Sequence, residues 1–189
     1  MPSEIDPMKA REYLIKRVQH DFTYKANFTE EQTEMWNDVK AIFDEFRSDV
    51  ATLFLMMPDG QDIMDKAEEY LAYKFALREA ERQVNSAIAN DWDKGTPIPH
   101  KDTMPILYDG PSGGKELRHK ICDGISKISY ELACSVASFA PQGRHLSIAL
   151  TRLEDVRGWL LDAVNHHCPK TLPNVSGGVN MAEIAAATG

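Results

Sequence analysis

Residues 144–164 read RHLSIALTRLEDVRGWLLDAV, a stretch in which apolar residues recur at spacings of three or four. This spacing places them on one face of an α-helix, where they form a core-facing stripe. The stripe consists of Leu146, Leu150, Leu153, Val156, Leu160 and Ala163. The first turns of the same helix carry the hydrogen-bond donors Arg144, His145, Ser147 and Thr151. Because the N-terminus of a helix favours anions, this start is predicted to hold a phosphate; the alternative is that the donors only cap an exposed first turn.

The helical period returns in three other segments, so we predict an all-α fold. Their apolar stripes are Val39, Phe43, Phe46, Val50, Leu53 and Met57; Tyr70, Tyr73, Leu77, Ala80, Val84 and Ala87; and Leu117, Ile121, Ile125, Ile128, Leu132, Val136 and Phe139. Before the first of these segments, Thr29 and Gln32 have the spacing of a capping box. Asp6 and Pro7 predict a further, short helix over residues 6–20.

Turn sequences divide these segments into two pairs. Residues 58–60 (PDG) break the first pair and residues 141–143 (PQG) break the second. Proline and glycine are frequent over 92–114, which predicts a linker. We therefore expect two tandem long-helix hairpins, the first in 1–91 together with the N-terminal helix and the second in 115–168, followed by a flexible tail over 169–189. Aligning Val39 with Ile121 and Leu77 with Leu153 keeps both cores in register, and an internal duplication explains this match.

The composition limits the classes of partner and compartment. The 189 residues are 43% hydrophobic and carry a net charge of −8, which predicts a globular core and argues against a nucleic-acid polymer as partner. Cys122, Cys134 and Cys168 form an odd set without paired spacing, which predicts a reducing compartment. The N-terminal residues lack the apolar region of a signal peptide, and the apolar runs are too short for a membrane span. We therefore expect a cytoplasmic protein.

The sequence favours a binding protein without a cofactor over an enzyme. It shows no Ser-His-Asp arrangement and no metal-ligand cluster, and the GPSGGK segment at 110–115 lacks the spacing of a phosphate loop. Two alternatives remain open. One is an all-α nucleotide pyrophosphohydrolase, in which Glu31, Glu34, Asp62 and Asp65 would bind magnesium. The other is a structural protein whose hairpins only oligomerise.

Residues 147–159, SIALTRLEDVRGW, resemble the C-terminal helix of a phage family of small helical proteins that sequester cyclic oligonucleotide signals of the bacterial CBASS defence. The first hairpin is similar to the same family in Tyr24, in FTEE at 28–31 and in NDVK at 37–40. In that family a tyrosine near the N-terminus and a lysine on the first long helix contact a cyclic dinucleotide. The resemblance therefore implies that Tyr24 and Lys40 bind the ligand.

The chemistry of these two side chains suits a nucleotide. A base stacked on a tyrosine gains about 1–3 kcal/mol, and a lysine meets a phosphodiester as a point charge. The alternative is that Tyr24 packs in a turn while Lys40 lies on a solvated helix face. In the second hairpin, Cys122 stands at the position that matches Lys40, and Tyr108 and Lys120 are the nearby substitutes.

The predicted phosphate site at 144–151 belongs to the second hairpin alone. The first hairpin has Glu68 and Phe75 at the positions that match Arg144 and Thr151. We therefore expect ligand contacts from Arg144, Ser147 and Thr151 in the second hairpin only.

The resemblance also implies an assembly and a function. Pockets of the family lie at subunit contacts within hexamers, so two repeats per chain predict a homo-oligomer, with three chains in place of six or a hexamer-like assembly. The expected function is to sequester a cyclic dinucleotide or trinucleotide signal without turnover. This would take place in the host cytoplasm and would block anti-phage defence.

Overall fold

The computed structural model describes residues 27–95, 106 and 108–169. All secondary-structure elements assigned in these ranges are helices. The all-α prediction is confirmed. The helices are α2 (Glu30–Leu55), α3 (Gly60–Lys66), α4 (Glu68–Asn90), the short 3-10 helix η1 (Trp92–Lys94), α5 (Leu117–Phe139) and α6 (Arg144–His167). The helix predicted over 6–20 and the tail from residue 170 lie outside the described residues, as do 96–105 and 107 of the linker.

The ends of α2 follow from local chemistry. At its start the predicted capping box is present: Thr29 Oγ1 accepts a hydrogen bond from the Gln32 backbone N–H at 3.2 Å, and Gln32 Oε1 accepts one from Thr29 at 2.9 Å. At its end the chain turns so tightly that a Cβ on Gly60 would lie 1.9 Å from the carbonyl oxygen of Phe54. Only glycine fits this turn, which confirms the predicted break at 58–60.

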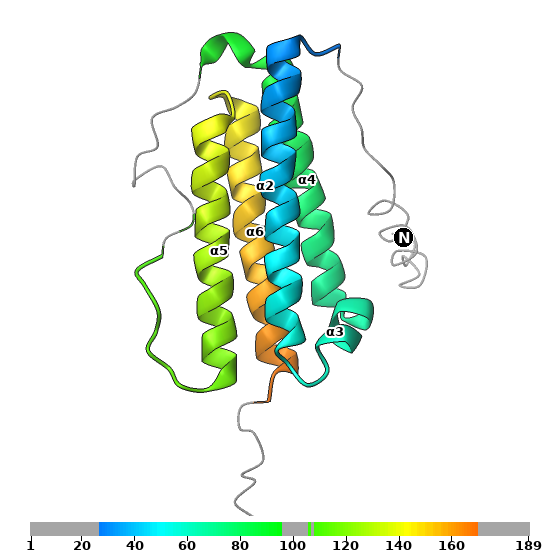
Figure 1. Cartoon of the computed structure of the whole chain (residues 1–189), viewed down its shortest axis with the longest axis vertical. Coiled ribbons are helices and arrows are strands. Elements are labelled where there is room, and N and C mark those ends of the chain that lie inside the picture. Colours follow the sequence, from blue (N-terminus) through cyan, green and yellow to red (C-terminus); the bar gives the residue numbers. More distant parts are fainter. Residues whose placement is uncertain (1–26, 96–105, 107, 170–189) are drawn as a thin grey trace, which may run out of the picture.

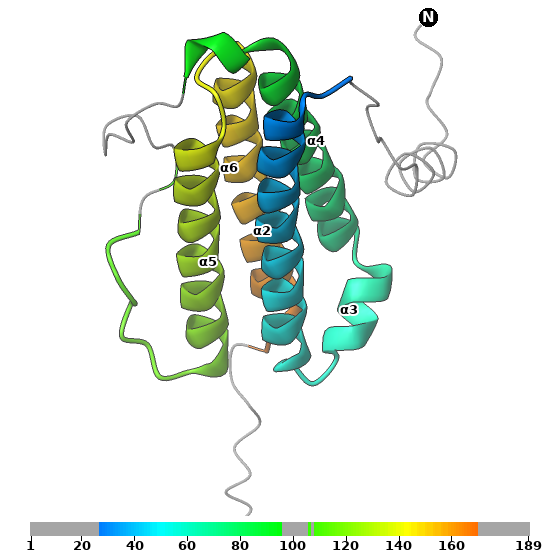
Figure 2. The same cartoon turned by 45° about the horizontal axis from the view of Figure 1, so that its top comes forward.

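The four long helices form a bundle with one long crossover (Figures 1 and 2). α2 and α6 run in one direction, and α4 and α5 run in the other. η1 lies at one end of the bundle, and α5 begins at the other end. Each long helix consequently has two antiparallel neighbours: α2 and α6 both contact α4 and α5. This is a known topology for helical bundles.

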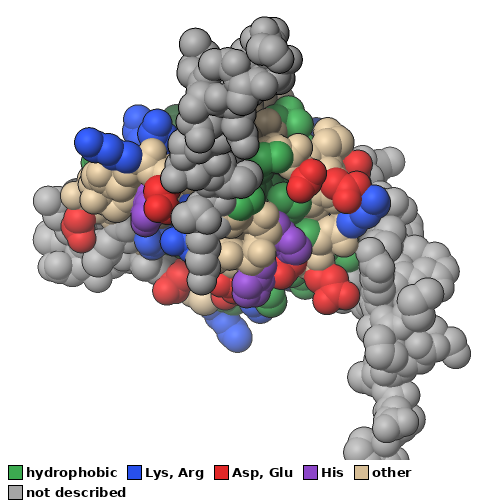
Figure 3. All heavy atoms as spheres, turned by 90° about the horizontal axis from the view of Figure 1, so that it is seen from below, with side chains coloured by type: hydrophobic (Ala, Val, Ile, Leu, Met, Phe, Trp, Pro, Cys, Tyr) green, Lys and Arg blue, Asp and Glu red, His purple; other side chains and the backbone are tan. Residues whose placement is uncertain are grey.

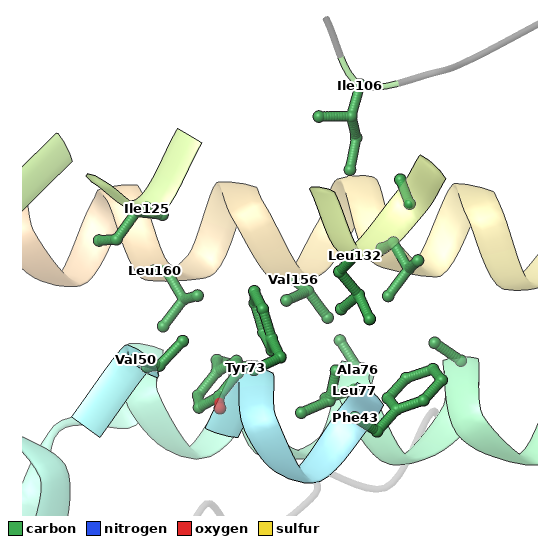
Figure 4. Packing of buried hydrophobic residues seen from close by; sticks show 14 of the residues in the cluster. Phe43, Val50, Tyr73, Ala76, Leu77, Ile106, Ile125, Leu132, Val156 and Leu160 are labelled. Atoms are coloured by element: carbon green, nitrogen blue, oxygen red, sulfur yellow. The ribbon is translucent and has the colours of Figure 1, made fainter. Parts of the chain in front are cut away.

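The two predicted hairpins share one core in three dimensions (Figure 4). Most of the predicted apolar stripes are buried in it, from Val39 on α2 to Ala163 on α6. Phe139, at the last position of α5, is 40% exposed and is an exception. Leu53 is only partly buried; it packs against α5, where a Cβ on Gly124 would come within 2.9 Å of its side chain. The division into repeats of 1–91 and 115–168 stays a prediction about the origin of the chain.

α4 and α6 pack most closely, and small side chains line their contact. Ala76, Ala80 and Ala87 of α4 and Ala149 and Ala163 of α6 are all buried. Small side chains allow two helix backbones to approach, so this seam is tightly packed.

Histidine–carboxylate contacts hold the two ends of the α4–α6 seam. At one end His145 Nδ1 lies 2.7 Å from Asp91 Oδ2. At the other end Glu69 accepts hydrogen bonds from His166 at 2.7 Å and from His167 at 3.2 Å. Figure 3 views the bundle from this second end, where histidine side chains lie beside acidic ones. These contacts join α4 to α6 at both ends of the seam.

The two carboxylates of these contacts have lowered pKa values. Burial alone would raise the pKa of Glu69, but hydrogen bonds from its own backbone N–H and from both histidines outweigh burial and lower the pKa to about 2. The pKa of Asp91 is lowered by hydrogen bonds from Lys94 and then from His145. Both groups are therefore ionised at neutral pH. None of the helices in the described ranges is long and apolar enough to cross a membrane.

Candidate functional site

A pocket of about 190 Å³ lies along the seam between α2 and α4. It is lined by Arg47 of α2 and by Tyr70, Tyr73, Lys74, Leu77 and Arg78 of α4. The α4 residues recur at helical spacing, so one edge of the helix carries cations while the adjoining stripe carries the aromatic rings. Three cationic side chains in one pocket stand out in a chain whose net charge is −8.

The tyrosines form a fixed aromatic wall of the pocket. Their rings are 5.0 Å apart between centroids, and Phe54 and Phe46 of α2 pack edge-on against them at 5.0 and 6.5 Å. Lys74 Nζ lies 5.1 Å from the centroid of the Tyr70 ring, within the range of a cation–π contact. The ring contacts from both helices hold the wall in one geometry.

Both tyrosine hydroxyls remain protonated at neutral pH. Burial raises the pKa of Tyr70 to about 12, and it raises the pKa of Tyr73 still further. Tyr73 is only 2% exposed, and it lines the pocket. A protonated tyrosine hydroxyl at the pocket wall can donate a hydrogen bond to an acceptor oxygen.

A buried carboxylate brings two guanidinium groups of the pocket together. Arg47 donates a hydrogen bond to Glu81 Oε2, and Arg78 Nη1 lies 3.8 Å from the same oxygen. The Glu81 side chain is only 8% exposed. Arg47 also donates to the exposed carboxylate of Asp44 at 2.8 Å. The two arginines, one from each helix, therefore meet at the same edge of the pocket.

Further basic side chains lie beyond the pocket toward Lys40, and acids such as Asp44 and Glu79 lie between them. Lys40 precedes Arg47 by seven residues, so it lies on the same face of α2 about 10 Å further along the helix. On α4, Lys74, Arg78 and Arg82 follow each other at spacings of four and share one face. A ligand larger than the pocket could therefore extend along this face.

Of the predicted site residues, Lys40 is the one that lies near this pocket. Tyr24 lies outside the described residues. Lys120 is exposed near the start of α5, and Arg144 is exposed at the start of α6, at opposite ends of the bundle about 30 Å apart. Tyr108 is half-buried, with its ring 6.3 Å from that of Tyr130 on α5. The structure does not gather the predicted residues into one pocket.

At the predicted anion-binding start of α6, the two hydroxyl groups already donate to backbone carbonyls. Ser147 Oγ donates its proton to the carbonyl of Gly143 at 3.1 Å, and Thr151 Oγ1 donates to the carbonyl of Ser147 at 3.1 Å. A hydroxyl has one proton, so neither can donate to an anion in this conformation. His145 is held by Asp91. Arg144 is left as the charged donor of that predicted set.

The carboxylates of the magnesium alternative do not converge. Glu31 and Glu34 lie in the first turns of α2, whereas Asp62 and Asp65 lie on α3 beyond its other end, about 35 Å away. Asp62 instead pairs with Lys66 at 2.6 Å. Within the described ranges, no group of three histidine, cysteine or acidic residues could hold a metal ion. The described part of the chain therefore does not bring these four carboxylates together into one site.

The pocket residues themselves were predicted only as core or not at all. The spacing of Lys74, Arg78 and Arg82 beside two tyrosines was the signal that could have indicated them. The position of Arg47 opposite them depends on which helices pack against each other in the folded protein. No protein-family model, curated protein or solved structure matches the chain.

Proposed function

We propose that this protein is a non-catalytic binding protein that captures a nucleotide-derived signal through a phosphate group in the α2–α4 pocket. The observation that carries the proposal is the convergence of Arg47, Lys74 and Arg78 beside two buried tyrosines. Arginine presents a planar fork to phosphate, lysine adds a point charge, and a tyrosine hydroxyl adds a neutral donor. A local basic pocket on an acidic protein suits a small anion rather than a nucleic-acid polymer.

The size of the pocket constrains how the ligand would lie. Pockets that enclose a whole drug-sized ligand measure about 300–1,000 Å³. At about 190 Å³, this pocket has room for one part of such a ligand. We assign that part to a phosphate and its adjoining sugar, with the remainder of the ligand along the basic face toward Lys40.

A cyclic dinucleotide or trinucleotide fits this arrangement, because it repeats a phosphodiester at fixed intervals. The resemblance of the chain to cyclic-oligonucleotide sponges supports this ligand class and independently singles out Lys40. The proposal then includes sequestration in the host cytoplasm, which would deprive an anti-phage effector of its signal. It also includes a homo-oligomer, as a trimer or a hexamer-like assembly.

The test is equilibrium dialysis of the full chain against 3′,3′-cyclic di-AMP, 3′,3′-cyclic GMP–AMP and cyclic tri-AMP, followed by heat release and chromatography. We expect one of these ligands to be retained and released unchanged. Absence of binding to all three would contradict the proposal and favour a structural protein. Recovery of a hydrolysed product would contradict the non-catalytic function.

A matched pair of variants tests the location of binding. Lys74→Gln removes one charge from the pocket and should weaken binding about tenfold, the effect of one lost charged hydrogen bond. Lys127→Gln removes the same charge from an exposed site on α5, where Lys127 faces Glu131 at 3.8 Å. It should leave affinity unchanged. Equal effects of the two variants would show that binding depends on net charge and not on this pocket.

A further inference from the structure

The pocket contains a feature that simple charge counting does not explain. Glu81, an acid, lies directly behind two of its three cations. Glu81 itself does not line the pocket. A carboxylate that only neutralised the site would weaken the binding of an anion.

We propose that Glu81 is a positioning residue, whose carboxylate holds Arg47 and Arg78 side by side at the pocket wall for a phosphate. This inference rests on the proposed function of the same pocket. Both guanidinium groups meet one oxygen of Glu81, although Arg47 comes from α2 and Arg78 from α4. Without the shared carboxylate, the like charges of the two guanidinium groups would repel each other across the seam.

Burial makes Glu81 the stronger anchor of Arg47. The other acid on Arg47, Asp44, has a side chain that is 60% exposed, so water and salt screen its contact. The Glu81 side chain is shielded from solvent. Its carboxylate therefore has few water molecules to bind in place of the guanidinium group, and the contact with Arg47 is strong. The arginines are consequently ordered before the ligand arrives, which removes part of the entropy cost of binding.

The positioning role and the neutralising role predict opposite results for Glu81→Gln. This substitution keeps the size of the side chain but removes its negative charge, so the pocket becomes more positive. If Glu81 only neutralises, Glu81→Gln binds 3′,3′-cyclic GMP–AMP more tightly. If Glu81 positions the arginines, affinity falls about tenfold or more, because at least one charged hydrogen bond to the phosphate is lost.

Asp155→Asn is the matched control for the charge change. Asp155 pairs with Arg152 at 2.9 Å on the surface of α6 and is remote from the pocket. It should leave affinity unchanged. Far-UV circular dichroism and thermal melting establish that each variant is folded before binding is compared.

Glu81→Asp provides the decisive second variant if Glu81→Gln does not fold. It keeps the charge but withdraws the carboxylate by one methylene group. A neutralising role predicts unchanged affinity, whereas the positioning role predicts a loss of several-fold, rising salt sensitivity and faster exchange of the arginine side-chain protons in the free protein. Unchanged affinity together with unchanged proton exchange would overturn the inference.

The two proposals fail in distinguishable ways. If the wild-type chain binds none of the cyclic nucleotides, the proposed function fails. Guanidinium proton exchange in the free wild-type chain then tests the positioning of the arginines directly, because slow exchange is expected and rapid exchange at both arginines would overturn it. If the wild-type chain binds but both Glu81 variants bind equally well, only the role of Glu81 fails.

Discussion

The two seams of α4 differ in what fills them. Toward α6, alanines allow close contact, and histidine–carboxylate contacts hold both ends. Toward α2, the side chains are tyrosines and long cations, the backbones approach less closely and a pocket remains. One face of a single helix thus contributes close packing, while another lines the pocket that we propose as the binding site. The difference follows from side-chain size, since large side chains keep helix axes apart.

Substitutions in the two seams should have different effects on stability and on binding. A tightly packed seam tolerates little extra volume, because its atoms already fill the space. An open seam tolerates changes of size and charge at its rim but loses ligand contacts. Substitutions in the α4–α6 seam should therefore affect folding, and those at the rim of the α2–α4 seam should affect binding.

The largest expected effect is on stability, from Ala80→Leu in the α4–α6 seam. Ala80 is fully buried, so the larger side chain should lower the free energy of unfolding by about 1–3 kcal/mol. Urea denaturation measures the change. Ala41→Leu, at an exposed position of α2, is the control and should be nearly neutral. If both variants were equally stable, the α4–α6 seam would not be tightly packed.

A smaller effect is expected at the end of the same seam, from Glu69→Gln. Because the pKa of Glu69 is lowered to about 2, its contribution is present above its ordinary pKa of 4.5 and is lost as the pH falls toward 2. Its histidine partners are exposed, so we expect only about 1 kcal/mol at neutral pH. Urea midpoints of wild type and variant should differ at pH 7 and converge near pH 2.

An exposed acid provides the control for this pH dependence. Glu131→Gln alters a surface contact with Lys127 on α5 and should show little difference from wild type at either pH. A difference for Glu69→Gln that persisted unchanged at pH 2 would show that the histidine contacts do not depend on its charge.

The smallest effect should come from Lys40→Ala, at the far end of the basic face. Lys40 is exposed and lies about 10 Å from Arg47 along α2, so its loss should weaken binding of 3′,3′-cyclic GMP–AMP about threefold and leave stability unchanged. Isothermal titration measures both wild type and variant. Unchanged affinity would remove Lys40 from the site and confine the ligand to the pocket.

The helices could be predicted from the sequence because their signals are local. The capping pattern of Thr29 and Gln32, the turn at 58–60 and the period of three and four depend only on neighbouring residues. The burial of two residues differs from the prediction, because it depends on contacts between helices. Phe139 is exposed at a helix end, and Leu53 lies in the groove against Gly124.

The candidate site could be predicted only in part, because it joins residues distant in sequence. Lys40 was indicated by a motif, but the pairing of Arg47 with Glu81 requires knowledge of which helices are neighbours. Tyr70 and Tyr73 were predicted as core, and they are buried, yet they also line a pocket. Helical periodicity distinguishes inside from outside; it does not report the space that remains between two helices.

The most direct test of the account is a map of backbone amide shifts on addition of 3′,3′-cyclic GMP–AMP to the isotopically labelled chain. We predict that the largest shifts cluster at Arg47 on α2 and over residues 70–78 of α4, with little change along the α4–α6 seam. Shifts centred on the start of α6 around Arg144, or no shifts at all, would contradict the assignment of binding to the α2–α4 pocket.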